Sequence, residues 1–502
     1  MTKTVLWIAC CIVGLGAAGW TGDPNWLFLV LYGLVMVFIS PLATSEQEFF
    51  LGARPGRSVG FWPLASSALI TWIFAKSITN AANLGHAFGI VGGIAYATYY
   101  LSFMVAGVII YRIRTTTGHG SLASFLTERF GPGAAVAFTL AIVIRLYNEV
   151  WSNTAVVASY FGPAGSYAYI LAAVVITAFT LSYSLKGGLR SSIATDIVQL
   201  LLASALLVFI LSKVLPSSGG LSKMLTVGEF TLTGGVDLIL VALLQSLSYP
   251  FHDPVLTDRA FISKPKTMRR AFFAAGIAGM GFIVLFSLVG VFAKIKGLAG
   301  PSTLSTAQFF GLPMLIIFNV IMLTSAGSTL DSTFSSISRL AAKDIGPLAR
   351  FSNNPWLRRA KARLEGASPV TVGQAAMVVI ALLGNLPLIA NPSILKATTI
   401  SGTMVMGLAP IFCFWWVKGA GRLSFHLAFW TGLALGLVAA LGRYPQSLAI
   451  GLGKYGGLLS INLFGLLLCT SLFFLPILVR NGRRHLLPSA QPIKIERKAR
   501  SA

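Results

Sequence analysis

Two of the apolar segments of this chain are interrupted by polar residues, and this pair of interruptions constrains the fold more than any other feature. The first leads into Lys76, and the second, at residues 248–254, holds Asp253 between two prolines. Charged residues at membrane depth usually face a cavity or a partner rather than lipid, and irregular backbone is tolerated there only where protein or water covers it. A matched pair of interrupted segments indicates the binding site of a secondary transporter.

The composition places these segments in a membrane. Of the 502 residues, 55% are hydrophobic and only 10% are charged. Repeated apolar stretches of about 20 residues are typical of membrane-spanning helices. The sequence therefore predicts an all-α polytopic membrane protein with about 14 transmembrane helices and no soluble domain.

The net charge of +24 raises nucleic-acid binding as an alternative, but the distribution of the basic residues argues against it. Most of them fall on one side of the predicted membrane, in the loops around Arg112, Arg190, Arg270 and Arg359 and in the C-terminal tail. This is the positive-inside bias, and it predicts a cell (inner) membrane protein of bacterial type with both termini in the cytoplasm.

The two interrupted segments also predict the domain organisation. The first, at 61–86, runs outward from the cytoplasm, whereas the second, at 234–256, runs inward. Five spans separate their starts, an odd number, so two five-helix units would be inverted relative to each other, as in many secondary transporters. The predicted parts are two peripheral helices in 1–44, a ten-helix core in 45–420 with repeats at about 61–212 and 234–417, two peripheral helices in 421–480, and a basic cytoplasmic tail in 481–502.

A third feature is a row of hydroxyl groups. Ser325, Ser328, Thr329 and Ser332 recur at the spacing that puts side chains on one stripe of a helix. Hard cations such as Na⁺ prefer oxygen ligands, and hydroxyls with freed backbone carbonyls supply them. Helix–helix packing by small residues is the alternative. A broken helix nearby favours the ion site.

A fourth segment, from Tyr183 to Gln199, contains Gly187-Gly188-Leu189 and Thr195-Asp196. Here the chain resembles the sodium:solute symporter family, whose signature is a tyrosine, Gly-Gly-Leu, then Thr-Asp and a glutamine. The resemblance covers about residues 45–420, and sodium/proline and sodium/galactose symporters are members that the chain resembles. Three more motifs carry it in the family's order: Phe49–Trp62, Pro254–Arg259, and Gly327–Leu330 followed by Asp344-Ile345.

The resemblance implies a sodium ion between the first and eighth core helices. Its ligands would be the backbone carbonyls of Ile70, Ile73 and Ser325 and the hydroxyls of Ser328 and Thr329. The family usually has alanine at the position of Ser325, but a carbonyl ligand survives that change. Some members hold a second sodium, and the matching positions here are Asp196 and Ser332.

Lys76 is the main departure from the family pattern, and substrate binds near this position in family members. A buried ammonium must be paired or neutralised, and Asp253 and Asp331 are the candidate partners. Three roles stay open. Lys76 holds a substrate carboxylate, it forms a structural ion pair, or it replaces a cation or carries the coupling proton.

Arg145 and Glu149 stand four residues apart on one helix face, which predicts a structural ion pair, with gating as the alternative. His252 is either a hydrogen-bond donor in the pocket or a proton-titrating group. Aromatic gates and aromatic packing are both open for Trp72 and Phe251. The predicted substrate-binding set is Trp72, Lys76, Ser77, Phe251, His252 and Asp253.

Together these features predict sodium-coupled uptake of a small polar organic solute by alternating access. Lys76 favours an amino acid or an organic carboxylate. The expected partners are this small-molecule solute, the sodium ion and the lipid bilayer, with no nucleic acid. We expect no cofactor, no metal other than Na⁺ as the coupling ion, and no enzymatic activity, because the phosphate-loop, metal-ligand and nucleophile–base motifs are missing. The oligomeric state stays open.

Two alternative functions stay open. One is a proton-coupled transporter in which Lys76, Asp253 or His252 titrates. The other is a membrane sensor that binds a solute without moving it. Uptake driven by a pH gradient in the absence of sodium would favour the first rival.

Overall fold

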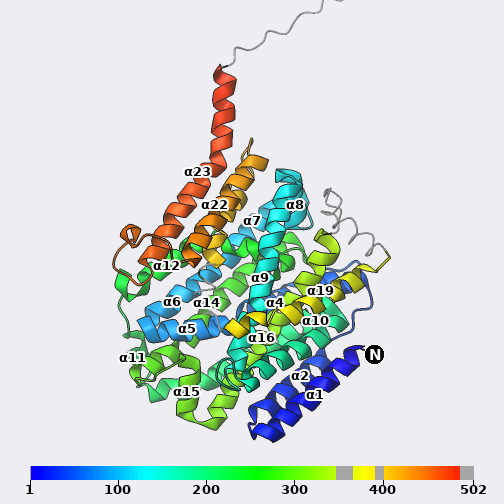
Figure 1. Cartoon of the computed structure of the whole chain (residues 1–502), viewed down its shortest axis with the longest axis vertical. Helices are drawn as coiled ribbons and strands as arrows, with labels where there is room; N and C mark the ends of the chain where they lie inside the picture. The colour runs from blue at the N-terminus through cyan, green and yellow to red at the C-terminus, as the bar shows by residue number, and fades with distance from the viewer. Residues whose placement is uncertain (1, 346–365, 391–398, 400, 487–502) are drawn as a thin grey trace, which may run out of the picture.

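The computed structural model describes residues 2–345, 366–390, 399 and 401–486. The regular elements of these residues are all helices, and the described part of the chain contains no β-strand (Figure 1). From residue 487 onward the predicted basic tail lies outside the described residues, as does most of 391–400. The chain is thus built of helices, as its composition predicts.

The first half of the chain forms α1 (Thr2–Thr21), α2 (Asn25–Ile39), α3 (Glu46–Leu51), α4 (Phe61–Trp72), α5 (Ala75–Phe88), α6 (Ile90–Ala97), η1 (Thr98–Tyr100), α7 (Leu101–Thr117), α8 (Leu122–Phe130), α9 (Pro132–Ala158), α10 (Tyr167–Ser217) and α11 (Leu221–Leu225). The second half forms η2 (Leu232–Val236), α12 (Asp237–Ser246), η3 (Tyr249–His252), α13 (Pro254–Arg259), α14 (Pro265–Ile295), α15 (Ser302–Phe310), α16 (Leu312–Arg339), η4 (Leu340–Ile345), α19 (Pro369–Leu383), η5 (Leu386–Ala390), α21 (Leu408–Cys413), α22 (Arg422–Ala440), η6 (Gln446–Leu448) and α23 (Gly456–Leu486).

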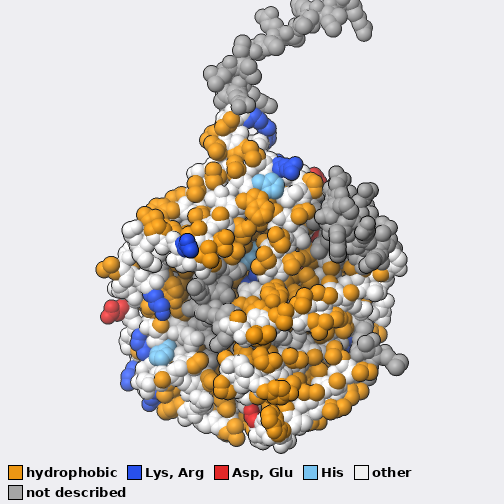
Figure 2. Space-filling view, viewed as in Figure 1, with side chains coloured by type: hydrophobic (Ala, Val, Ile, Leu, Met, Phe, Trp, Pro, Cys, Tyr) orange, Lys and Arg blue, Asp and Glu red, His pale blue; other side chains and the backbone are white. Residues whose placement is uncertain are grey.

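Many of these helices are suited to a membrane. Among the described residues, eight are long and apolar enough to cross one, or nine when the bent pair α4 and α5 counts as one span. On the face that Figure 2 shows, hydrophobic side chains are widespread and charged side chains are few. Val208 and Leu382, for example, are 69% and 71% exposed. Soluble proteins rarely expose apolar patches of this extent, so the chain is a multi-pass membrane protein whose outer face meets lipid.

The helix α10 covers two spans that the sequence predicts separately, at 166–185 and 191–212. Its 51 residues would extend to roughly 76 Å, which is far more than a bilayer needs. Gly188 interrupts it with a non-helical backbone (φ 53°, ψ −136°). Gly188 therefore divides α10 into two helices at the position between the two predicted spans, and the count of about 14 spans stays a prediction.

The first interrupted segment is a broken helix. The axes of α4 and α5 differ by 58°. Between them Ile73 has φ −78° and ψ 65°, and the extended backbone of Phe74 (ψ 145°) starts α5 in its new direction. Because no helix continues through this point, backbone carbonyls at the end of α4 lose their usual partners.

The second interrupted segment is broken in a similar way. After α12 ends at Ser246, the short η3 turn carries the chain to Asp253, whose extended backbone (φ −100°, ψ 97°) precedes α13. Pro254 occupies the first turn of α13, and Asp253 caps that helix by accepting from the amide of Val255 at 3.1 Å. Proline fits a first turn because its missing N–H would be unsatisfied there in any case.

The helix α16 lies at the centre of the bundle and packs against α10, α4, α9 and α13 (Figure 1). Behind the first broken helix, α14 approaches α5 very closely. A Cβ on Gly290 of α14 would lie 1.6 Å from the carbonyl oxygen of Ala82 in α5. The first broken helix therefore packs closely against α14 and also against the hydroxyl-rich α16.

Candidate functional site

The end of α4 meets the hydroxyl stripe of α16 at the predicted sodium position. Thr71 Oγ1 lies 3.4 Å from Ser328 Oγ, and Thr329 donates its hydroxyl to the carbonyl of Thr71 at 3.4 Å and to that of Ser325 at 3.0 Å. All the predicted ligand residues are fully buried: Ile70, Ile73, Ser325, Ser328 and Thr329. Residues more than 250 positions apart, such as Thr71 and Ser328, therefore come together at the helix break.

The donor set at this position suits a sodium ion. It consists of neutral hydroxyls and of carbonyls near the end of α4, of which that of Ile70 accepts from the amide of Ile73 at 3.1 Å. The hydroxyl of Ser325 is buried and has no hydrogen-bond partner among the described residues. This hydroxyl is not one of the predicted ligands, because the ligand expected from Ser325 is its carbonyl, which accepts from Thr329 at 3.0 Å.

The predicted second sodium position contains an arginine. Arg259, the last residue of α13, is fully buried. Its Nη2 lies 3.0 Å from Asp196 Oδ2 and 2.6 Å from Ser332 Oγ. Its Nε donates to Ser67 Oγ at 2.8 Å. The two residues that would bind a second sodium are thus already bound by a guanidinium group.

A second carboxylate, Asp331, lies next to this arginine cluster. It accepts hydrogen bonds from the hydroxyls of Ser192 (2.6 Å), Tyr183 (3.0 Å) and Thr195 (3.0 Å). Ion pairs within the described part of the chain do not include Asp331. Ser192 also contacts the Nη2 of Arg259 at 3.2 Å. Arg259 therefore pairs with Asp196, and the hydroxyl of Ser192 connects it to Asp331.

Four alternating charges form a chain beside the two broken helices. Lys76 Nζ lies 2.7 Å from Glu149 Oε1, and Arg145 pairs with the same carboxylate. Arg145 Nη2 then lies 2.8 Å from Asp253 Oδ2. The ring of Phe74 faces both cations, at 4.9 Å from Lys76 Nζ and 5.5 Å from Arg145 Cζ. All four charged side chains are buried, so each charge depends on the others for compensation.

The remaining predicted substrate residues have partners of their own. Trp72 packs edge-on against Tyr249, with ring centroids 5.8 Å apart, and Phe251 stacks on Phe412 at 4.2 Å. Ser77 Oγ lies 3.1 Å from the hydroxyl of Tyr96. His252 Nδ1 donates to the carbonyl of Tyr249 at 2.6 Å, and its Nε2 lies 3.2 Å from Ser401 Oγ. Trp72 and His252 therefore both contact Tyr249. Phe251 contacts Phe412 instead, and Ser77 contacts Tyr96.

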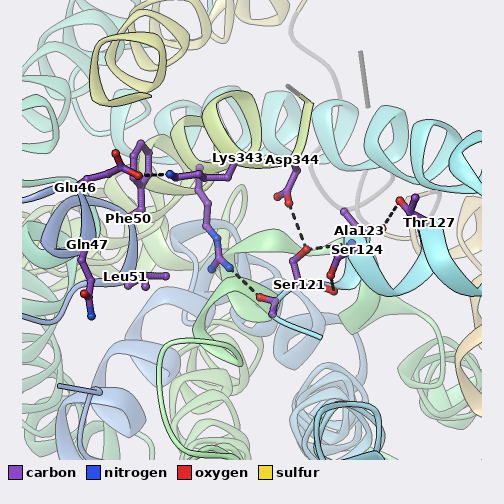
Figure 3. Close-up of a pocket in the computed structure, with 12 residues that line it drawn as sticks. Glu46, Gln47, Phe50, Leu51, Ser121, Ala123, Ser124, Thr127, Lys343 and Asp344 are labelled. Atoms are coloured by element: carbon purple, nitrogen blue, oxygen red, sulfur yellow. Dashed lines mark hydrogen bonds and ion pairs between the residues drawn. The ribbon is translucent and has the colours of Figure 1, made fainter. Parts of the chain in front are cut away.

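A cavity of about 650 Å³ lies away from all these residues, among the ends of α3, α8 and α16 (Figure 3). Glu46 pairs with Lys343 across it, and Ser121 donates to Asp344 at 3.3 Å. Arg339 donates to the carbonyl of Gly120 at 3.3 Å. None of the predicted sodium or substrate ligands lines the cavity, and α16 connects the two regions.

Comparison with known proteins points to sodium-coupled transporters. Mouse sodium/glucose cotransporter 4 is 24% identical over 193 residues, 36% of this chain and 28% of its own length. Sheep sodium/glucose cotransporter 1 is 27% identical over 179 residues, 34% and 26% of the two chains. The chain thus matches less than a third of the length of these curated relatives. No family model matches it.

Solved structures extend the likeness to most of the chain. A Na⁺-coupled sialic acid symporter in its substrate-bound outward-open state has a TM-score of 0.68 at 17% identity, covering 90% of this chain and 98% of that one. Mhp1, a nucleobase-cation-symport-1 family transporter in a closed conformation, has a TM-score of 0.56 at 14% identity, covering 88% and 98%. At these identities the likeness shows the fold. The resemblance to sodium:solute symporters is confirmed.

The similar proteins are transporters rather than enzymes, and several are sodium-coupled. Arg259 enters the sequence analysis only as the last residue of a family motif and is not placed among the site residues there. Its signal was present, because an arginine ends the second broken segment directly after Thr257 and Asp258. Nothing in the linear sequence says that this side chain turns inward to Asp196, which lies 63 residues away.

Proposed function

We propose that this protein is a sodium-coupled symporter that takes up a small polar organic solute across the cell membrane by alternating access. One observation carries the proposal: the break after α4 meets the hydroxyl stripe of α16, so that carbonyls and hydroxyls from two distant segments share a buried position. The sodium/glucose cotransporter relatives and the fold of the sialic acid symporter support the coupling to sodium.

The proposed sodium ligands are the carbonyls of Ile70, Ile73 and Ser325 and the hydroxyls of Ser328 and Thr329. Bound sodium would hold the end of α4 against α16 by supplying a positive charge to their oxygens. A ligand shifts a conformational equilibrium only when it binds one state better than the other. Movement of α4 relative to α16 would separate the ligands, so sodium favours the state in which the two helices are together.

The proposed substrate class is a molecule that carries a carboxylate, with an amino acid as the best fit. Lys76 and Arg145 share Glu149, so an incoming carboxylate can replace Glu149 as the partner of Lys76. An amino group on the same solute would then find Glu149 or Asp253. A zwitterion leaves the charge of the network unchanged, whereas a solute with one charge would add an uncompensated charge to a buried site.

We also propose the five-plus-five inverted-repeat arrangement with about 14 spans and both termini in the cytoplasm. The two breaks support it, because each lies in the helix that would open one repeat. The basic loops and the positive-inside rule support the orientation. On this orientation the cavity of Figure 3 opens at the cytoplasmic end of α16.

Uptake into proteoliposomes tests the proposal. The purified full chain is supplied with pooled labelled amino acids and organic acids under an inward sodium gradient, under an inward proton gradient without sodium, or under neither. Uptake that requires the sodium gradient supports symport. Uptake that follows the proton gradient alone supports the proton-coupled rival with Lys76, Asp253 or His252. Saturable solute binding to the purified protein without uptake under any gradient supports the sensor.

A further inference from the structure

The guanidinium group of Arg259 lies in the middle of a buried cluster of oxygens. Its Nη2 contacts Asp196 (3.0 Å), Ser332 (2.6 Å) and Ser192 (3.2 Å). Its Nε donates to Ser67 at 2.8 Å, and its Nη1 to the carbonyl of Val255 at 2.8 Å. Arginine has five N–H donors and keeps its charge in proteins. The cluster is therefore organised around a permanent cation that belongs to the chain.

These oxygens include both groups that the family resemblance assigns to a second sodium, Asp196 and Ser332. A sodium ion needs the lone pairs of its ligands to face it. Here Asp196 Oδ2 and Ser332 Oγ face a nitrogen at hydrogen-bonding distance instead. The residues present therefore fit a guanidinium group at this position and do not fit a metal ion beside it.

The contacts of Asp196 lead to the same result. Its Oδ1 accepts from Ser328, a proposed ligand of the first sodium, at 2.5 Å, and its Oδ2 accepts from Ser67 at 2.5 Å and from Arg259 at 3.0 Å. Both oxygens of this carboxylate therefore already have donors, and one of the donors is the guanidinium group.

We propose that the Arg259 guanidinium takes the place of a second sodium ion, so that the protein binds a single sodium, at the break between α4 and α16. This inference rests on the sodium site of the proposed function. The proposed function leaves open how many sodium ions bind, because symport works with one sodium or with two. The inference sets that number at one. It also gives Arg259 a positioning role: the residue holds Asp196, which in turn accepts from the sodium ligand Ser328.

The experiment measures the binding of ²²Na⁺ alone to the purified full chain in detergent, at saturation, as ions per protein. Wild type is expected to bind one ion, and Thr329→Ala is expected to weaken that binding at least tenfold. Two ions in wild type would overturn the inference and leave the proposed function standing. A single ion whose affinity is unchanged in Thr329→Ala would place it elsewhere and overturn the inference. No bound ion would overturn the sodium site itself.

A variant series tests the arginine directly. Arg259→Gln removes the charge and frees Asp196, so it is expected to bind two sodium ions, whereas Arg259→Lys keeps the charge and is expected to bind one. Arg259→Gln that folds and still binds one ion with unchanged affinity would overturn the inference. If Arg259→Gln does not fold, the wild-type stoichiometry and the Thr329→Ala result decide the question by themselves.

Discussion

Lys76 shows how a buried charge depends on residues that are far from it in the sequence. The sequence indicates that Lys76 needs a partner and suggests Asp253 or Asp331, but the structure pairs it with Glu149. The pairing of Arg145 with Glu149 follows from local spacing, because residues four apart share a helix face. The partner of Lys76 depends on how α5 packs against α9. The spacing of residues within one helix does not predict that packing.

At the sodium site, we predict that Ser328→Ala lowers the affinity for ²²Na⁺ at least tenfold, or about 1.4 kcal/mol. The change removes a proposed ligand and leaves the helix intact. Thr333→Ala is the matched control, since Thr333 is also buried on α16 and its hydroxyl has no partner among the described residues. Equal affinities in the two variants would contradict the assignment of Ser328.

In the charge network, Glu149→Gln is predicted to lower the free energy of unfolding by roughly 3 kcal/mol or more, because Lys76 and Arg145 are left with one carboxylate between them. Denaturant unfolding in detergent, followed by tryptophan fluorescence, measures the loss. The double variant Lys76→Met with Glu149→Gln keeps the Arg145–Asp253 pair and restores the balance. It should lose less than Glu149→Gln alone, and a larger loss would argue against charge compensation.

At the scale of helices, the two broken segments are the best-predicted feature. Prolines and polar residues in an apolar run already indicate the interruptions, and the structure contains both breaks. The angle of 58° between α4 and α5 depends on packing and is not encoded in that pattern.

We predict that Gly290→Ala lowers the melting temperature in detergent, because the added Cβ would lie 1.6 Å from the carbonyl oxygen of Ala82. That atom belongs to backbone, so it cannot move without shifting α5. Gly281→Ala on the same helix is the control, since nothing lies within 4 Å of its Cβ position. Alanine favours a helix over glycine by about 1 kcal/mol, so Gly281→Ala should be neutral or stabilising. A similar effect of both changes would refute close packing at Gly290.

The short helix α3 gives a pH-dependent prediction. Hydrogen bonds from the amide and the hydroxyl of Thr44, both 2.8 Å from Glu48 Oε2, lower the pKa of Glu48, and the Arg190 guanidinium adds to this. A lowered pKa stabilises the folded state above the ordinary value of 4.5, and the stabilisation disappears as the pH falls through the lowered pKa.

Glu48→Gln should therefore melt at a lower temperature than wild type at pH 7, and the difference should shrink on acidification below pH 4.5. Glu46→Gln is the control, because the side chain of Glu46 is 46% exposed and its pair with Lys343 contributes little. A difference between Glu48→Gln and wild type that stays constant from pH 7 to pH 3 would exclude the ionised carboxylate as its cause.

For the whole molecule, composition and charge distribution are enough to predict a helical membrane protein, because lipid requires apolar outer surfaces and satisfied backbone groups. The family resemblance adds the fold, and the likeness to the sialic acid symporter over 90% of the chain agrees with it. The number of spans stays a prediction: among the described residues eight helices, or nine with the bent pair, are long and apolar enough to cross a membrane, and α10, which Gly188 divides, counts as one of them. Composition and the family resemblance do not predict the contacts of Arg259, because these contacts involve side chains from several helices.

The central claim is that solute and sodium cross together, and solute-stimulated sodium entry tests it most directly. Proteoliposomes containing the full chain are given external ²²Na⁺ at zero membrane potential, with or without the pooled unlabelled amino acids and organic acids. The account predicts that solute accelerates ²²Na⁺ entry in wild type and has little effect in Ser328→Ala. Entry of labelled solute from the same pool without any acceleration of ²²Na⁺ entry would contradict it.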